Sequence, residues 1–313
     1  MVLAELRQSP FLDDLTPADR RVVPLLLTLV VGVVAALLAA VICGAAVFVA
    51  FAIGGGGVGS AERLMVVIGG GQTPAGLTQI AFVISLLAFV NGGMALAFVG
   101  VAAMLHDRRL ASYFTAAPRF SWRLLLLGLG LFALTIGPLL LASAALDPKA
   151  HGAPLLAVSP DLGGRLAYVA LTVSLLVIAA AAEELVFRGW LIKIVGAWFP
   201  DPRVVLVLSG LLFSAIHFDP NLDAFLVRLA MGVGLAWMTL RLGGVEFAVG
   251  AHAANNILIL LFIQPMSLKP DPPHGFPPET LVIAPLMLAG YVALAEIVAR
   301  WAPLRRWTRL AIT

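Results

Sequence analysis

Charged residues are scarce in this 313-residue chain. Asp, Glu, Lys and Arg make up 12% of it, whereas 61% of its residues are hydrophobic. A soluble domain typically has about 25% charged and about 45–50% apolar residues, so the composition excludes that class and predicts a polytopic membrane protein. Cysteine is nearly absent: Cys43 alone can form no intramolecular disulfide, and its place in an apolar run predicts a small packing residue.

Signals for several other functions are missing as well. The net charge of +3 comes from basic residues at the ends of apolar runs, which gives no indication of nucleic-acid binding. The glycine-rich stretches 54–57 and 69–71 do not lead into a Gly-Lys-Ser/Thr sequence, so we expect flexible loops there rather than phosphate-binding loops. No internal repeat is visible, and a transporter built from two duplicated halves therefore has no support.

Long apolar runs are what the chain has instead. Runs of about 20 apolar residues predict membrane-spanning helices. We expect residues 1–313 to form one membrane domain, with a polar segment, 1–23, before the first span and a stiff extramembrane loop at the Pro-rich residues 270–278. The sequence predicts an all-α membrane protein with eight transmembrane helices, near residues 24–52, 78–104, 124–145, 166–199, 203–218, 225–241, 246–264 and 280–300.

The distribution of basic residues predicts the orientation of these helices. If the N-terminus is cytoplasmic, fifteen of the 20 Lys and Arg residues fall on the cytoplasmic side of the membrane. Positive charge is retained on that side, so we expect both termini, and with them the segment 1–23, to be cytoplasmic.

Three polar clusters, at residues 183–188, 213–217 and 252–256, interrupt the apolar runs. Ionisable side chains at membrane depth are costly and persist mainly where they pair, line a wet cavity or take part in chemistry. Glu184 and Arg188 are four residues apart on a helix, in the favourable order for an ion pair. Glu183 is rotated by about 100° from Glu184 and should face a different neighbour. A carboxylate in a partly dry pocket suits a general base.

The other two clusters carry histidines. Phe213 and His217 are four residues apart, as are His252 and Asn256, so each pair lies on one helix face. Taken alone, His217 could be a hydrogen-bonded residue near a helix end, and His252 with Asn256 could be a polar contact between helices. For the first cluster, the corresponding alternative is a packing ion pair with a spare acid.

Depth along the helices favours one common site. The runs 166–199 and 203–218 should form a hairpin, in which Glu183 lies about 24 Å before the turn and His217 about 21 Å after it. The basic tip of this hairpin should project from the membrane, which brings both side chains near the depth of His252, about 9 Å from the inner end of its own helix. Three separate runs with polar groups at one level indicate a functional site.

Taken together, Glu-Glu-x-x-x-Arg, Phe-x-x-x-His and His-x-x-x-Asn, in this order on successive spans, resemble the CAAX prenyl protease and bacteriocin-processing family of intramembrane glutamic endopeptidases. The resemblance covers about residues 160–265 and implies an eight-helix fold. It implies that Glu183 activates water with the help of His217. It also implies that His252 and Asn256 stabilise the oxyanion of the tetrahedral intermediate.

The same resemblance implies the remaining features of such an enzyme. Glu184 and Arg188 would orient the site, and neither a cofactor nor a metal would be required. The substrate would be a membrane-anchored peptide or protein, prenylated or amphipathic, that reaches the site from the lipid bilayer. The distribution of the family implies a bacterial host and its cytoplasmic (inner) membrane. Residues 1–150 carry no matching motif, and the oligomeric state is not indicated.

Two other functions are compatible with these residues. Glu183, His217 and His252 could be zinc ligands of a membrane protease, although the chain has no His-Glu-x-x-His sequence and the three would have to converge within about 2.0–2.2 Å of one ion. A non-enzymatic membrane protein for transport, immunity or scaffolding is the other alternative, because intramembrane Glu and His residues can form a proton relay. The ordered set of three clusters favours the protease.

Overall fold

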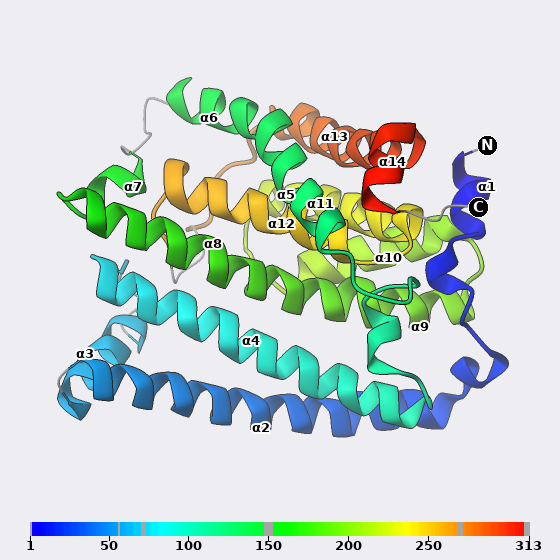
Figure 1. The fold of residues 1–313 in the computed structure, drawn as a ribbon, viewed down its shortest axis with the longest axis horizontal. Coiled ribbons are helices and arrows are strands. Elements are labelled where there is room, and N and C mark those ends of the chain that lie inside the picture. Colours follow the sequence, from blue (N-terminus) through cyan, green and yellow to red (C-terminus); the bar gives the residue numbers. More distant parts are fainter. Residues whose placement is uncertain are drawn as a thin grey trace.

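The protein is helical throughout the residues that the structure, a computed structural model, describes: 2–55, 57–69, 73–74, 76–146, 153–267 and 272–309. Within them, β-structure is confined to one isolated bridge between Thr115 and Gly244. Long helices lie alongside one another in a bundle, with α2 at one edge of the view and α13 near the other (Figure 1).

The helices have the following bounds. The longer ones are α2 (Val22–Gly54), α3 (Val58–Gly69), α4 (Leu77–Leu105), α5 (Trp122–Thr135), α6 (Gly137–Leu146), α8 (Leu162–Glu184), α9 (Leu191–Trp198), α10 (Pro202–Ala215), α11 (Leu222–Leu242), α12 (Glu246–Leu258) and α13 (Thr280–Arg300). The short ones are α1 (Val2–Arg7), α7 (Pro154–Ala157) and α14 (Ala302–Thr308). The remaining turns are η1 (Pro10–Leu12), η2 (Pro17–Arg20) and η3 (Leu110–Tyr113), which are 3₁₀, and η4 (Leu185–Trp190) and η5 (Ile259–Ile263), which are π-helical.

Seven helical stretches in the described part of the chain are long and apolar enough to cross a membrane, which makes this an integral membrane protein. They correspond to seven of the eight predicted spans, and the longest is the continuous run of α8, η4 and α9 over 37 residues. The span predicted over 203–218 is represented by α10, whose 14 residues are about 21 Å long, short of a hydrocarbon core of about 30 Å. Eight crossings and cytoplasmic termini therefore stay predictions.

Parts of the predicted loops lie outside the described residues, namely 56, 70–71 and 270–271. The described remainder of the Pro-rich loop, 272–278, contains no helix and contacts the start of α11: the backbone N–H of His274 donates to the side-chain oxygen of Asn221 at 3.0 Å. Cys43 is half-buried and packs against Gly93 of α4, as expected for a small packing residue.

The N-terminal segment contacts helix ends at one end of the bundle, where α1, α9 and α14 lie (Figure 1). Arg108, just after α4, forms ion pairs of 2.6 Å with both Asp14 and Asp19. Lys193 of α9 pairs with Asp14, also at 2.6 Å. The orientation predicted from the sequence placed these two basic residues and the N-terminal segment on the same side of the membrane, and the structure brings them together.

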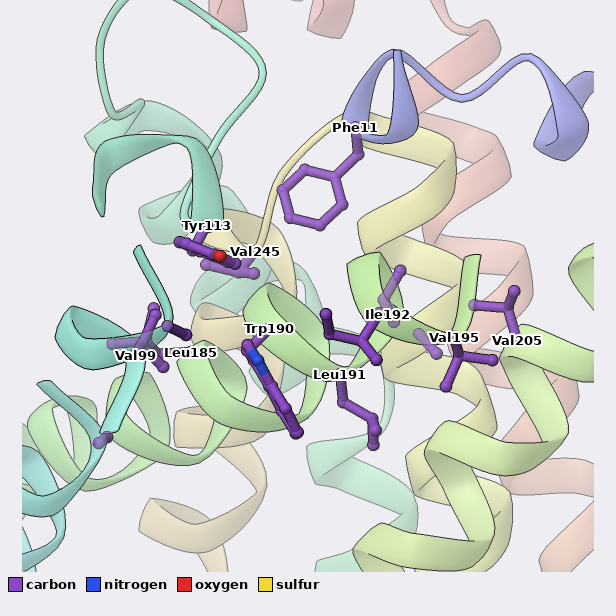
Figure 2. Close-up of a cluster of buried hydrophobic side chains, with 14 of the residues drawn as sticks. Phe11, Val99, Tyr113, Leu185, Trp190, Leu191, Ile192, Val195, Val205 and Val245 are labelled. Carbon is purple, nitrogen blue, oxygen red and sulfur yellow. The ribbon is translucent and has the colours of Figure 1, made fainter. Parts of the chain in front are cut away.

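Buried side chains around η4 and α9 tie this end of the bundle to the polar clusters. Phe11 of η1 belongs to the same hydrophobic cluster as Trp190 of η4 (Figure 2). Trp190 meets Phe98 of α4 edge to face, with ring centroids 4.8 Å apart. Gly189 lies so close to the backbone carbonyl of Tyr113 that a Cβ there would be 2.5 Å from its oxygen. This packing fixes the turn that carries the first polar cluster.

Candidate active site

The first polar cluster lies where α8 changes into the π-helical turn η4. Glu184 is the last residue of α8, and Arg188 follows inside η4. The predicted ion pair is present: the Arg188 guanidinium lies 3.0 Å from Glu184 Oε1, and both side chains are fully buried. Arg188 also donates to the Gly232 carbonyl at 3.1 Å and lies over the Phe213 ring at 4.3 Å. Single π-helical turns of this kind often occur at functional sites.

His252 of α12 links the two adjacent glutamates. Its Nδ1 lies 2.8 Å from Glu184 Oε1, and its Nε2 lies 3.7 Å from Glu183 Oε2. A carboxylate that already pairs with Arg188 can only accept, so Nδ1 is the donor to Glu184 and Nε2 faces Glu183. The side chain of Glu183 is 25% exposed, whereas that of Glu184 is fully buried. One carboxylate is therefore enclosed, and its neighbour is open.

His217 follows α10, and its ring is held by the backbone of that helix. Its Nδ1 lies 2.8 Å from the Phe213 carbonyl oxygen, which can only accept, so the neutral ring leaves Nε2 as an acceptor. Phe213 touches His217 and His252 edge to face, with centroids 5.1 and 5.8 Å apart. The next residue, Phe218, has a positive φ of 48°, an uncommon backbone conformation for a bulky residue that marks the sharp departure from α10.

Asn256 lies one helical turn beyond His252 and is half-buried. Its side-chain oxygen accepts a hydrogen bond of 3.1 Å from Asn255. Its amide NH₂ group makes no hydrogen bond within the described residues and is available as a donor. Sequence reasoning did not single out Asn255, and its only sequence signal was its place beside Asn256.

A cavity of about 630 Å³ opens beside Glu183 and His217. Its walls come from α2, α4, the end of α8, η4 and the segment after α10. They consist of Val33, Ala36, Leu37, Leu87, Asn91, Met94, Ala95, Phe98, Ala182, Glu183, Val186, Phe187, Ile216 and His217. Most of this surface is apolar, and three of the lining side chains, Asn91, Glu183 and His217, carry hydrogen-bonding groups. The structure thus brings the three sequence clusters together and adds α2 and α4, which no motif had indicated.

The zinc alternative requires a convergent set of ligands. It needs Glu183, His217 and His252 around a single ion. Within the described ranges, no group of three or more His, Cys, Asp or Glu side chains is arranged so that it could hold a metal ion. Both imidazole Nδ1 atoms are engaged, one by Glu184 and the other by a backbone carbonyl, so either ring could bind a metal only through Nε2.

Comparisons with known proteins find matches over the stretch that carries the three clusters. Residues 165–258 match the family model "Type II CAAX prenyl endopeptidase Rce1-like", so an Rce1-like domain, of a family of proteases, is found there. The uncharacterized protein YyaK of Bacillus subtilis (strain 168) is 35% identical over 92 residues, which are 28% of this chain and 31% of that protein. The matched stretch thus spans about a third of this relative. No solved structure matches the chain.

Proposed function

We propose that this protein is an intramembrane endopeptidase in which Glu183 activates a water molecule for attack on a peptide bond. The Rce1-like domain supports membrane protease activity in general, and the matched residues include all three clusters. The catalytic role of Glu183 is the finer part of the proposal. It rests on the different surroundings of two carboxylates that are adjacent in sequence.

The observation that carries the proposal is the contrast between Glu183 and Glu184. Glu184 is enclosed, paired with Arg188 and bonded to His252, so it has no access to a substrate. Among the described residues, no arginine or lysine pairs with Glu183, which is partly exposed and lines a cavity together with His217. A general base needs access to water and a free lone pair, and of the two acids only Glu183 has both.

The proposed reaction begins with a water molecule between Glu183 and His217 Nε2. Glu183 takes one proton as the water oxygen bonds to the carbonyl carbon, which gives a tetrahedral oxyanion. The same proton then passes to the leaving nitrogen as the C–N bond breaks, so that an acid and an amine are released. General acid–base catalysis of this kind contributes about 10² to 10⁴ in rate.

Two donors are available for the negative charge of the intermediate. The NH₂ group of Asn256 makes no hydrogen bond among the described residues, and Asn255 donates to its oxygen. His252 is held in one orientation by Glu184, which lets its Nε2 side serve the oxyanion when the ring is protonated. Removing one donor of this type typically costs about 10² to 10³ in rate.

The cavity suggests how substrates arrive. Its apolar walls on α2 and α4 suit the side chains of a membrane-anchored or amphipathic peptide, and prenylated peptides belong to the same class. We place the protein in the cytoplasmic membrane of a bacterium, with the arginine-rich end of the bundle inside.

The test compares purified wild-type protein with Glu183→Gln in liposomes, using a library of synthetic apolar peptides and mass spectrometry of the products. The matched control is Glu62→Gln, an exposed carboxylate on α3 outside the cavity. We expect cleavage by wild type and control, and a loss of at least about 10²-fold in Glu183→Gln with an unchanged melting temperature. Full activity of Glu183→Gln would refute the role of Glu183.

Further measurements on the same proteins separate the alternative functions. Stoichiometric zinc in the purified protein, together with activity that is lost on chelation, would favour a zinc protease. Absence of any cleavage by the wild type, with proton-coupled uptake into the liposomes, would favour a transporter. A binding function that survives Glu183→Gln would favour a scaffold.

A further inference from the structure

Asn91 is an amide in the middle of an apolar helix. It lies 14 residues from each end of α4, which is about 21 Å in either direction. Its side chain is half-buried and has no hydrogen-bond partner in the described ranges. Transferring an amide into an apolar environment without a partner costs several kcal/mol on water-to-hydrocarbon scales, so polar residues of membrane helices usually find one. Interhelical pairing therefore does not explain Asn91.

The position of Asn91 shows where its partner must come from. The residue lines the same cavity as Glu183 and His217, but from the wall that α4 contributes. Its neighbours on this wall, Leu87 and Met94, are apolar and offer no hydrogen bond. A group that bonds to Asn91 has to enter the cavity, and it would then share that cavity with the two residues to which we assign the activation of water.

Peptide hydrolysis within a membrane leaves backbone groups of the substrate in need of hydrogen-bond partners. A substrate helix satisfies its own backbone hydrogen bonds, and the bond to be cleaved is accessible only after local unwinding. Unwound N–H and C=O groups in the hydrocarbon region cost several kcal/mol each unless the protein pairs them. An asparagine side chain has one acceptor oxygen and two N–H donors, so it can pair with both the N–H and the C=O of a peptide backbone.

We infer that Asn91 binds the unwound backbone of the substrate beside the scissile bond, in a cavity whose other walls take apolar side chains. This inference rests on the proposed endopeptidase activity and narrows its substrates to peptides that are extended and apolar on both sides of the cleaved bond. Asn91 acts in binding, whereas Glu183 acts in the chemical step. The site therefore includes α4, which lies outside the Rce1-like domain.

The test uses the full chain in liposomes. The substrate is the library peptide that the wild type cleaves best and that Glu183→Gln does not cleave. Asn91→Leu keeps the helix and removes the amide, and Ser85→Ala is the matched polar-to-apolar control on the same helix, outside the cavity. We expect Asn91→Leu to raise KM about 10- to 100-fold with kcat changed by less than about threefold, because binding of ground state and transition state is lost alike. Ser85→Ala should behave as wild type.

A series of the same peptide, each with one N-methylated backbone position, identifies the backbone group that bonds to Asn91. Methylation at the position that Asn91 binds should raise KM for the wild type but not further for Asn91→Leu. A wild-type KM for Asn91→Leu, or an equal response of both proteins at every methylated position, would overturn the inference while the protease assignment stands. A lower melting temperature with unchanged KM would show a structural role and overturn it too. Absence of any Glu183-dependent cleavage would refute the proposed function, and this inference with it.

Discussion

Replacing Arg188 by methionine should destabilise the protein far more than replacing an ordinary arginine. Arg188 and Glu184 are both fully buried, and their charged groups are 3.0 Å apart. Arg188→Met removes the only cation beside Glu184 and leaves that carboxylate with His252 as its remaining hydrogen-bond partner in the described structure. The substitution is similar in length and apolar, so the loss of charge is the main change.

The magnitude follows from the distance and the burial of the pair. At an effective dielectric constant of about 20, two unit charges about 3 Å apart attract by about 5 kcal/mol. Breaking a buried pair by removing one partner costs about 3–5 kcal/mol, because the other charge stays buried without compensation. The Gly232 carbonyl and the Phe213 ring lose their contacts with the guanidinium as well. We expect a loss of about 3–5 kcal/mol in the free energy of unfolding.

The assay is denaturant unfolding in mixed micelles, followed by tryptophan fluorescence. The double variant Glu184→Gln/Arg188→Met should recover most of the loss, because it removes both charges and keeps an oxygen acceptor for His252. As a matched control, Arg228→Met breaks a partly exposed pair with Asp219 and should cost about 1 kcal/mol or less. Wild-type stability of Arg188→Met, or a double variant that is less stable than the single one, would refute this reasoning.

Two further predictions concern helix packing and pH. Gly128→Ala should cost about 1–3 kcal/mol because its Cβ would collide with the Phe247 carbonyl of α12, whereas Gly130→Ala on the same helix meets nothing within 4 Å and should be neutral or stabilising in thermal melts. Burial acts to raise the pKa of the Asp19 carboxyl, but hydrogen bonds from Arg108 and Thr16 and the charge of Arg108 outweigh it and hold the pKa below its usual 3.8. The folded state is therefore stabilised above pH 3.8 and loses this contribution as the pH falls through the lowered pKa. Amide exchange in residues 2–20 should accelerate over that pH range. Asp19→Asn should abolish this pH dependence.

Much of the helical architecture could be predicted because apolar runs of membrane length leave little alternative. Seven of the eight predicted spans correspond to long apolar helices in the described residues. The helix that represents the span predicted over 203–218 ends at Ala215, and the following residues turn away, which hydropathy does not detect. The ion pair of Glu184 with Arg188 follows from helical spacing alone, since both residues belong to one element.

Contacts between distant segments could not be predicted in the same way. The sequence indicated that segment 1–23 lies on the cytoplasmic side, but not that Asp14 and Asp19 bind Arg108, about 90 residues away. Asp and Arg residues are common at helix ends, and nothing in their local spacing marks these as partners. The packing of the N-terminal segment against α9, α10 and α11 brings Asp14 and Asp19 to Arg108.

The different surroundings of the two glutamates also depend on residues that no motif identifies. Helical geometry predicts that Glu183 and Glu184 point in different directions, about 100° apart, but not which of them meets a cavity. That cavity exists because α2 and α4 form a wall opposite Glu183, while α12 closes over Glu184 through His252. The described residues of α2 and α4, in which sequence reasoning found no motif, therefore place Glu183 rather than Glu184 at a cavity. If the proposed function holds, variation of their cavity-lining side chains should change the peptides cleaved and leave the chemistry at Glu183 the same.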